Sequence, residues 1–344
     1  MADEHSEDKR ESNRKLSRRF MLAMSGGTAG LVGTKVIWDH FEGFQTALSF
    51  IGKAPDYNSD LQRIVRDGFL AIGLSKTGTR GKTVFLKANL VEPLGPERAA
   101  TTHPSLLSAV ASEFLSLGAA KVMIGDGSAH CRDGLLIAEA CGVRPLIKDL
   151  GIQYVDLNHD SIVVRKTKSQ LTGLGNFLLP ASLVHADIVV SIAKMKTHHW
   201  AGVTLTMKNL FGVLPGICYG WPKNIFHQIG IEKTILDLTA CIRPSVAIID
   251  GIVGMEGDGP IMGVPRNAGV IVMGTNAVAT DATAVRLMGQ SPDRIKYLSE
   301  ASGWLGPVNE SVIQQRGEPI GANVSHFAFP ENLSLGRFSG GVGS

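Results

Sequence analysis

One stretch of the chain, residues 194–212, concentrates side chains that can bind an anion or move a proton. It reads K-M-K-T-H-H-W-A-G-V-T-L-T-M-K-N-L-F-G and follows the apolar run I-V-V-S-I-A, which is typical of a buried strand. In open α/β sheets, ligands bind beyond the carboxyl ends of the strands. The stretch therefore predicts a binding site for a carboxylate or a phosphate. The simpler alternative is that its charges are the solvated face of an ordinary helix.

Apolar residues recur at helical spacing between Trp200 and Leu214, and they predict one helix whose apolar stripe packs inward. Thr204 and Lys208 are four residues apart and would share a face of that helix. The K-M-K-T-H-H segment would then be the loop before the helix. Its lysines would lie beside the free N–H groups and partial positive charge of the helix N-terminus, an arrangement that favours anions.

Polar residues also follow the other predicted strands. Lys87 and Asn89 lie two residues apart near the end of V-F-L-K-A-N-L-V, on the same side of the strand. The strand K-V-M-I-G-D-G ends at Asp126, and the strand V-A-I-I-D-G ends at Asp250. A glycine-rich loop with two more acidic residues follows. Strand ends of this kind are expected to converge on a shared site.

These residues fall into three sets of candidates. The substrate-binding candidates are Lys87, Asn89, Lys196, Thr197, Thr204, Lys208 and Asn209. The catalytic candidates are Lys194, His198 and Glu256. A lysine among other lysines in a desolvated cleft has a lowered pKa and can act as a base or nucleophile, while histidine and glutamate can transfer protons. The candidate ligands for a divalent metal ion are Asp126, Asp250 and Asp258. Helix capping or a solvated turn is the simpler interpretation of each aspartate alone.

The sequence excludes several common sites. G-K-T at residues 81–83 is no P-loop, because Lys76 stands where that motif needs glycine and the segment precedes a strand. The glycines after Asp250 do not match a dinucleotide fingerprint, and no G-x-S-x-G element supports serine hydrolase chemistry. The four cysteines are scattered without a C-x-x-C pair. A net charge of +3 does not indicate the strongly basic surface that is typical of nucleic-acid-binding proteins.

Strands and helices alternate along most of the chain, which predicts the α/β class with an open, mainly parallel sheet flanked by helices. Helices are expected at residues 58–74 and 105–117, and a small β-rich excursion is expected around residues 151–187. The chain of 344 residues is 44% hydrophobic and is long enough for one large core. We expect a single α/β domain over residues 41–330 and a loose polar tail over residues 331–344.

The first 40 residues have the pattern of a disordered leader followed by an export signal. Arg18 and Arg19 precede the uncharged run at residues 20–34, which is shorter than the roughly 20 residues that span a bilayer. The segment resembles a twin-arginine signal, which implies the twin-arginine export machinery as a partner and a periplasmic location. Without a clear A-x-A cleavage site, the segment is also a candidate membrane anchor. The alternative is a cytoplasmic protein with a basic N-terminus.

Four motifs together resemble the family called domain of unknown function 362. They are K-M-K-T-H, T-x-x-x-K-N-L-F-G, D-G-I-V-G-M-E-G-D-G-P and A-T-D-A-T-A-V-R-L-M-G, and the resemblance covers about residues 83–305. It implies an α/β domain with signature residues Lys194, Lys196, His198, Thr204, Lys208, Asn209, Asp250, Glu256 and Gly257. Some relatives carry a ferredoxin-like module with closely spaced cysteines, which this chain lacks. The resemblance implies no reaction.

Two classes of function fit these features. The first is an enzyme that acts on a small anionic molecule, a carboxylate or a phosphate, with or without the help of a divalent metal ion. The second is a non-catalytic protein that binds a metal, a cofactor or an iron–sulfur partner through the same histidines and acids. The sequence identifies neither the substrate nor a resident cofactor.

Overall fold

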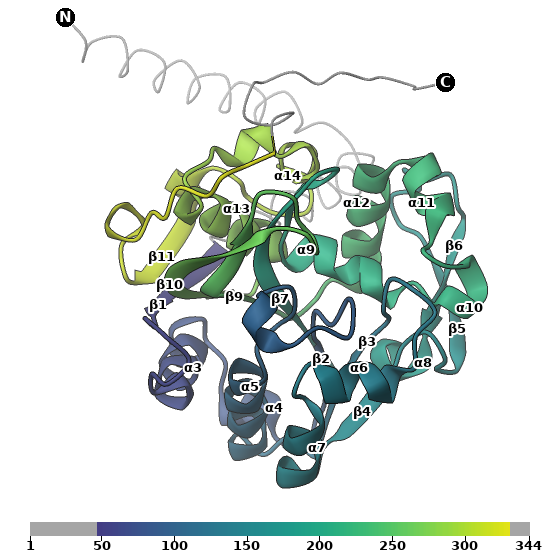
Figure 1. Cartoon of the computed structure of the whole chain (residues 1–344), viewed down its shortest axis with the longest axis horizontal. Helices are drawn as coiled ribbons and strands as arrows, with labels where there is room; N and C mark the ends of the chain where they lie inside the picture. Colours follow the sequence, from purple (N-terminus) through teal and green to yellow (C-terminus); the bar gives the residue numbers. More distant parts are fainter. Residues whose placement is uncertain (1–46, 331–344) are drawn as a thin grey trace, which may run out of the picture. The chain divides into compact units, whose positions relative to one another are not determined.

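The structure, a computed structural model, describes residues 47–330. Most of the strands in this part of the chain join one nine-stranded sheet with the order β11-β1-β10-β9-β7-β2-β3-β4, and β8 pairs with β7 (Figure 1). The strands of this sheet are β1 (Ala47–Lys53), β2 (Thr83–Lys87), β3 (Lys121–Asp126), β4 (Gln153–Asp156), β7 (Ile188–His198), β8 (Gly202–Thr204), β9 (Val246–Glu256), β10 (Val264–Gly274) and β11 (Ile313–Gly317).

Most neighbouring strands in the large sheet are parallel. The pairs β3·β4, β2·β3, β2·β7 and β7·β9 are parallel, whereas β10 runs antiparallel to both β9 and β1. The predicted α/β class and mainly parallel sheet are therefore confirmed. The predicted β-rich excursion is present as a separate hairpin of β5 (Ile162–Lys166) and β6 (Asn176–Pro180). Its first expected strand, however, is β4, which pairs with β3 at the edge of the large sheet.

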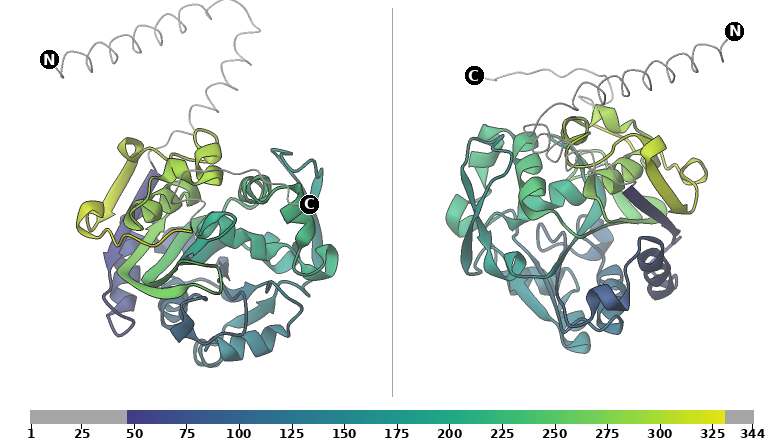
Figure 2. Two further views of the ribbon diagram at one scale, coloured as in Figure 1. Left: turned by 45° about the horizontal axis from the view of Figure 1, so that its top comes forward. Right: turned by 180° about the vertical axis from the view of Figure 1, so that it is seen from behind.

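Helices cover both faces of the sheet. They are α3 (Leu61–Ala71), α4 (Lys76–Thr79), α5 (Pro104–Ser116), α6 (Gly134–Ala140), α7 (Arg144–Leu150), α8 (Ala181–Val184), α9 (Thr206–Asn209), α10 (Gly216–Tyr219), α11 (Asn224–Ile229), α12 (Ile231–Ile242), α13 (Ala277–Leu287) and α14 (Lys296–Ala301). Helices α3 and α5 lie on one face, and α12 and α13 lie on the other (Figures 1 and 2). Each face buries its own apolar cluster, so the architecture has three layers.

The two helices expected near residues 58–74 and 105–117 are α3 and α5. Asp60 accepts a hydrogen bond from the backbone N–H of Arg63 and caps α3, whose predicted apolar stripe is buried. Pro104 begins α5, where its missing N–H costs nothing. Periodicity was sufficient at these positions because each helix packs one apolar stripe onto the sheet.

The prediction of one helix from Trp200 to Leu214 is wrong for the first half of this segment. Strand β7 continues through His198, the chain then turns, and β8 runs back antiparallel to β7 with Thr204 opposite Lys196. Helix α9 begins only at Thr206. The K-M-K-T-H segment is therefore strand and not a loop at a helix N-terminus. The apolar spacing had a different cause, because Val203 of β8 and Met207 of α9 are buried in the same cluster.

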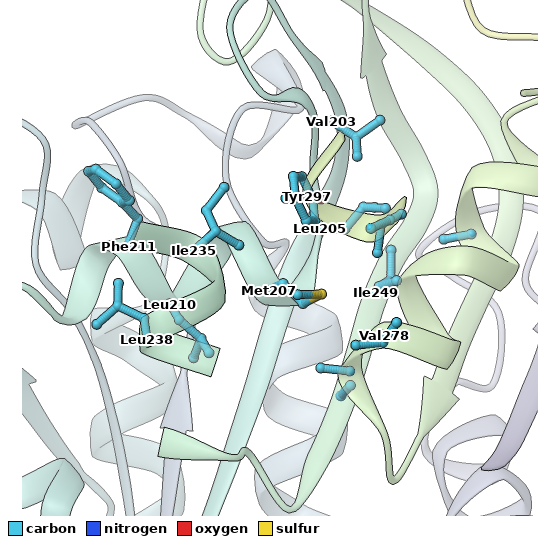
Figure 3. Packing of buried hydrophobic residues seen from close by; sticks show 14 of the residues in the cluster. Val203, Leu205, Met207, Leu210, Phe211, Ile235, Leu238, Ile249, Val278 and Tyr297 are labelled. Carbon is cyan, nitrogen blue, oxygen red and sulfur yellow. The ribbon is translucent and has the colours of Figure 1, made fainter. Parts of the chain in front are cut away.

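Helix α9 has only one turn, and its position is fixed by its neighbours. Met207 lies near Val278 of α13, and the 3₁₀ turn that follows α9 places Leu210 beside Leu238 of α12 (Figure 3). Asp281 of α13 is buried and accepts hydrogen bonds from the backbone N–H groups of Thr206 (2.9 Å) and Met207 (3.0 Å). A carboxylate from another helix thus caps α9.

None of the helices in residues 47–330 is long and apolar enough to cross a membrane. The leader with its export-signal-like segment and the polar tail at residues 331–344 lie outside the described residues. Their predicted roles, including export and membrane anchoring, stay predictions.

We predict that Asp281→Ala lowers the free energy of unfolding by roughly 2–4 kcal/mol, because it leaves two buried N–H groups of α9 without an acceptor. Urea denaturation of the purified protein measures this change. Asp60→Ala is the matched control, since it removes the side-chain cap of α3 at an exposed position and should cost only about 1 kcal/mol. Equal losses in the two variants would contradict the role assigned to Asp281.

Candidate functional site

A cavity of about 350 Å³ lies at the carboxyl ends of three adjacent strands. Lys87 is the last residue of β2, Asp126 is the last residue of β3, and Lys196 lies near the end of β7. The predicted site residues that line the cavity are Lys87, Asn89, Asp126, Lys196, His198, Thr204, Lys208, Asn209 and Asp258. We name the cavity the lysine pocket after four of its lining residues, Lys87, Lys196, Lys208 and Lys223.

Lys87 is fully engaged by the protein. Its Nζ donates to the Ala88 carbonyl (2.7 Å) and to Asn209 Oδ1 (3.1 Å), and it forms an ion pair with Asp126 Oδ1 (2.6 Å). Neither side chain of the ion pair is more than 3% exposed. A Cβ on Gly212 would overlap Asp126 Oδ1 and lie 2.8 Å from Lys87 Nζ, so only glycine fits there. Lys87 and Asp126 therefore form the rigid base of the lysine pocket.

Asp126 makes three close contacts within the protein. Besides Lys87, its oxygens accept the backbone N–H groups of Leu90 (2.5 Å) and Gly127 (2.7 Å). Asp126 is therefore the counter-ion of Lys87, whereas the sequence suggested it as a metal ligand.

Lys196 is buried and only partly engaged. Its Nζ donates to the carbonyls of Ala100 (2.7 Å) and Pro260 (3.2 Å). Burial lowers its pKa to about 7, and the charges of Lys208 and Lys194 add to the shift. A neutral amine has two N–H bonds and one lone pair. With both N–H bonds directed to carbonyls, the lone pair occupies the remaining tetrahedral position of a nitrogen that lines the pocket.

Lys208 and Lys223 have fewer partners still. Lys223 Nζ donates to the Gly127 carbonyl at 3.1 Å, and burial lowers the pKa of Lys223 to about 7. Lys208 Nζ lies 4.3 Å from the centre of the Phe211 ring and makes no hydrogen bond to any residue between 47 and 330. Burial, with the charge of Lys87, lowers the pKa of Lys208 to about 8. These two amines are the ones most available to an anion.

Two buried oxygen atoms in the lysine pocket lack a partner in the described part of the chain. They are Asn89 Oδ1 and Thr204 Oγ1, on side chains that are each 4% exposed. Unpaired buried polar atoms are costly, so their presence in a cavity indicates a polar ligand or ordered water. Asn209, by contrast, uses both ends of its amide to join Lys87, Asn89 and Ser191, and acts as a structural bridge.

His198 is placed as a hydrogen-bond donor. Its Nδ1 accepts the backbone N–H groups of Trp200 (3.1 Å) and Ala201 (3.2 Å), so the neutral ring carries its proton on Nε2. Burial lowers the pKa of His198 well below its usual value, and the neighbouring Lys208 lowers it further. His198 is consequently neutral at pH 7 and can donate a hydrogen bond to a ligand, but it is poorly suited to act as a base.

Lys194 lies outside the lining of the lysine pocket. It is fully buried, and its Nζ contacts Asp250 Oδ2 (2.7 Å), the Tyr57 hydroxyl (2.8 Å) and the Val253 carbonyl (3.0 Å). Asp250 also accepts the Tyr57 hydroxyl and the backbone N–H of His103. The three acceptors of Lys194 leave no position for a substrate. The structure thus places this predicted catalytic lysine in a closed ion pair.

The remaining predicted site residues are also placed apart from one another. Glu256 accepts the backbone N–H of Ala328 at 2.9 Å and lies outside the pocket lining. Thr197 also lies outside the lining, and its hydroxyl donates to the Gly257 carbonyl. Asp258 is at the rim and 74% exposed. Between residues 47 and 330, no three His, Cys, Asp or Glu side chains are grouped so that they could hold a metal ion. The proposed metal ligands therefore do not converge.

Lys223 and His227 are pocket residues that sequence reasoning did not assign to the site. Lys223 follows Pro222 in the turn-rich segment before α11 and has a left-handed backbone with φ of 70°. His227 lies in α11, and its ring is 4.8 Å from that of Trp200. A lysine in a turn normally indicates a solvated surface, so the sequence offered no signal that Lys223 is buried.

Comparison with known proteins identifies the family. The model described as domain of unknown function (DUF362) matches residues 84–286, and the chain belongs to this family. A curated relative, a thylakoid-associated protein of Synechocystis, is 28% identical over 262 residues, which are 74% of this chain and 78% of the relative.

Two solved structures have partial likeness to the fold. The lactate racemase apoprotein of Thermoanaerobacterium thermosaccharolyticum has 16% identity and a TM-score of 0.39 over 62% of this chain and 52% of that one. A protein of Thermotoga maritima has 12% identity and a TM-score of 0.33 over 61% of this chain and 52% of that one. The matched part is thus about half of each structure, and likeness at this level carries no conclusion about the chemistry of the lysine pocket.

We predict that Lys194→Met lowers the free energy of unfolding by about 3–5 kcal/mol, because it leaves the Asp250 carboxylate buried without its cation. The double variant Lys194→Met with Asp250→Asn should recover part of this loss. Urea denaturation of both variants and of Asp250→Asn completes the cycle. Lys82→Met is the control, since Lys82 pairs with Asp187 at the surface and should contribute less than about 1 kcal/mol. A loss from Lys194→Met as small as the control would contradict this assignment.

Proposed function

We propose that this member of the DUF362 family is an enzyme that binds a small carboxylate or phosphate in the lysine pocket and moves a proton with Lys196. The observation that carries the proposal is the unequal engagement of the four lysines. Lys87 has three acceptors, Lys196 has two, Lys223 has one, and Lys208 has only an aromatic ring. Protonated amines that the fold leaves without acceptors in a cavity of low dielectric favour a ligand that supplies negative charge.

The charge balance of the lysine pocket favours an anion over a cation. Its lining contains four lysines and two aspartates, and one of the aspartates is exposed at the rim. Asp126 neutralises Lys87, so the excess positive charge falls on Lys196, Lys208 and Lys223. An anion bound between these groups would be held by charge-assisted hydrogen bonds in a site of low dielectric, where such bonds are strongest.

Lys196 is the best candidate for the proton-transfer group. Its pKa of about 7 makes a substantial fraction neutral at physiological pH, and its two carbonyl acceptors orient the lone pair of the neutral amine. In the proposed step, the amine takes a proton from the carbon next to the substrate carboxylate and becomes an ammonium. The electron pair of the broken C–H bond moves to the carboxylate as an enolate, whose extra charge is stabilised by Lys208 and Lys223.

We predict that Lys208→Met and Lys223→Met each weaken the binding of sulfate by roughly 10- to 100-fold, since each removes a charge-assisted hydrogen bond. Isothermal titration calorimetry at pH 7 measures the dissociation constants. Sulfate is a suitable probe because its charge is constant across neutral pH. Lys121→Met is the matched control, because Lys121 is exposed at the opposite end of β3 from the pocket.

The affinity for sulfate should also fall as the pH rises. Lys196 and Lys223 have pKa values of about 7 and Lys208 of about 8, so the free pocket loses its positive charge as the pH rises through this range. Sulfate affinity should therefore be higher at pH 6 than at pH 9, and binding at pH 8 should take up protons. Affinity that is independent of pH, or unchanged in both lysine variants, would contradict an anion site.

Proton transfer has a separate test. We predict that the protein, incubated in D₂O with a panel of small mono- and dicarboxylic acids, exchanges the C–H next to a carboxylate of at least one of them, as measured by proton NMR. Lys196→Met should slow the exchange at least 100-fold, the usual contribution of a general base, while Lys121→Met should not change it. Sulfate binding without exchange of any acid would instead identify a non-catalytic anion-binding protein.

A further inference from the structure

We infer that the ligand of the lysine pocket is amphiphilic: an anionic head bound by the lysines carries an apolar substituent, of about the size of an aromatic ring, that contacts Trp200 and Met262 at the mouth. The inference rests on the proposed anion site and specifies the class of molecule that the site takes. It comes from the way that charge and apolar surface are separated between the floor and the rim of the pocket.

The floor of the lysine pocket is polar and buried. Lys87, Lys196 and Lys223 are at most 2% exposed, and the unpaired Asn89 Oδ1 and Thr204 Oγ1 belong to side chains that are 4% exposed. An ion that pairs with Lys196 or Lys223 must therefore enter deeply and leave bulk water. Any remaining part of the same molecule has to extend toward the mouth.

The rim has a different chemistry. Trp200 and Met262 both line the pocket and are 60% and 72% exposed, so they place large apolar surface together at its mouth. Ile261 and Pro222, which are half-buried, add to the same apolar lining. The acidic residue at the rim is Asp258, which gives the mouth no positive charge to hold an anionic head there. The apolar side chains are thus placed along the route between the lysines and solvent.

Trp200 is held in place despite its exposure. It lies in the turn between β7 and β8, and its ring is in edge contact with the ring of His199 (4.7 Å) and with that of His227 (4.8 Å). Its backbone N–H donates to His198. An exposed indole with a fixed orientation loses little conformational entropy when a ligand covers it, which is the property expected of a binding surface.

The size of the lysine pocket agrees with a ligand of two parts. A volume of about 350 Å³ is at the small end of the range of roughly 300–1,000 Å³ for ligand sites, and it corresponds to the liquid volume of roughly twelve water molecules. A sulfonate, phosphate or carboxylate head fills only part of it. The remainder, between the lysines and Trp200, accommodates a ring or a short alkyl chain.

Methanesulfonate and benzenesulfonate test this inference, because they share one anionic head with a constant charge and differ only in the apolar part. We expect the full-length protein to bind benzenesulfonate roughly tenfold more tightly than methanesulfonate in calorimetric titrations at pH 7. In Trp200→Ala and Met262→Ser the ratio should fall toward one, while the affinity for methanesulfonate stays unchanged. Trp304→Ala is the control for removal of a partly exposed indole elsewhere in the chain.

Lys208→Met separates this inference from the proposed function, since it should weaken both sulfonates by a similar factor. Equal affinity of the wild-type protein for the two sulfonates would overturn the amphiphilic ligand and leave the anion site standing. A preference for benzenesulfonate that survives in both rim variants would overturn the role of Trp200 and Met262. Failure of sulfate and of both sulfonates to bind would overturn the anion site and the amphiphilic ligand together.

Discussion

The cost of burying an ammonium group is the constraint on which the rest of this structure depends. Five lysines, Lys87, Lys194, Lys196, Lys208 and Lys223, have pKa values lowered chiefly by burial. Moving such a charge out of water costs several kcal/mol, which only close acceptors or an anion can offset. The fold meets this cost completely at Lys87 and Lys194, each with a carboxylate and two further acceptors. It meets the cost only in part at the other three, and all three face one cavity.

The number of acceptors around each lysine nitrogen distinguishes the lysines in closed ion pairs from those that face the pocket better than burial does. Lys194 and Lys196 are two residues apart on β7 and equally buried, but only Lys196 lines the lysine pocket. The ion pair of Lys194 with Asp250 joins β7 to β9, where the register shifts between Lys194 and Lys196. The ion pair of Lys194 at this irregularity fixes the part of β7 that also carries Lys196. The closed pair thus supports the open site without taking part in its chemistry.

The contacts that fix helix α9 are the second feature on which the site depends. A one-turn helix has almost no intrinsic stability, because the nucleus costs more than one hydrogen bond returns. Asp281 caps it from α13, and Met207 is buried in the apolar cluster below it. The same turn carries Lys208 and Asn209, and the amide of Asn209 links Lys87 at the end of β2 to Ser191 within β7. In the function that we propose, the buried lysines, the fixed turn of α9 and the apolar rim together remove an anionic head from water next to an oriented amine.

The sequence by itself determined the α/β class, the helices α3 and α5, the family, and nine of the residues that line the lysine pocket, because apolar periodicity and polar residues after buried strands are local signals. It misplaced the ends of β7 and β9, since a strand was taken to end where its apolar run ended. Both strands continue through polar residues whose partners come from distant segments, such as Tyr57 for Lys194 and Ala100 for Lys196. Only the tertiary structure could decide which lysine is satisfied and which is left open to a ligand, because a count of acceptors around a nitrogen depends on contacts that no local pattern records.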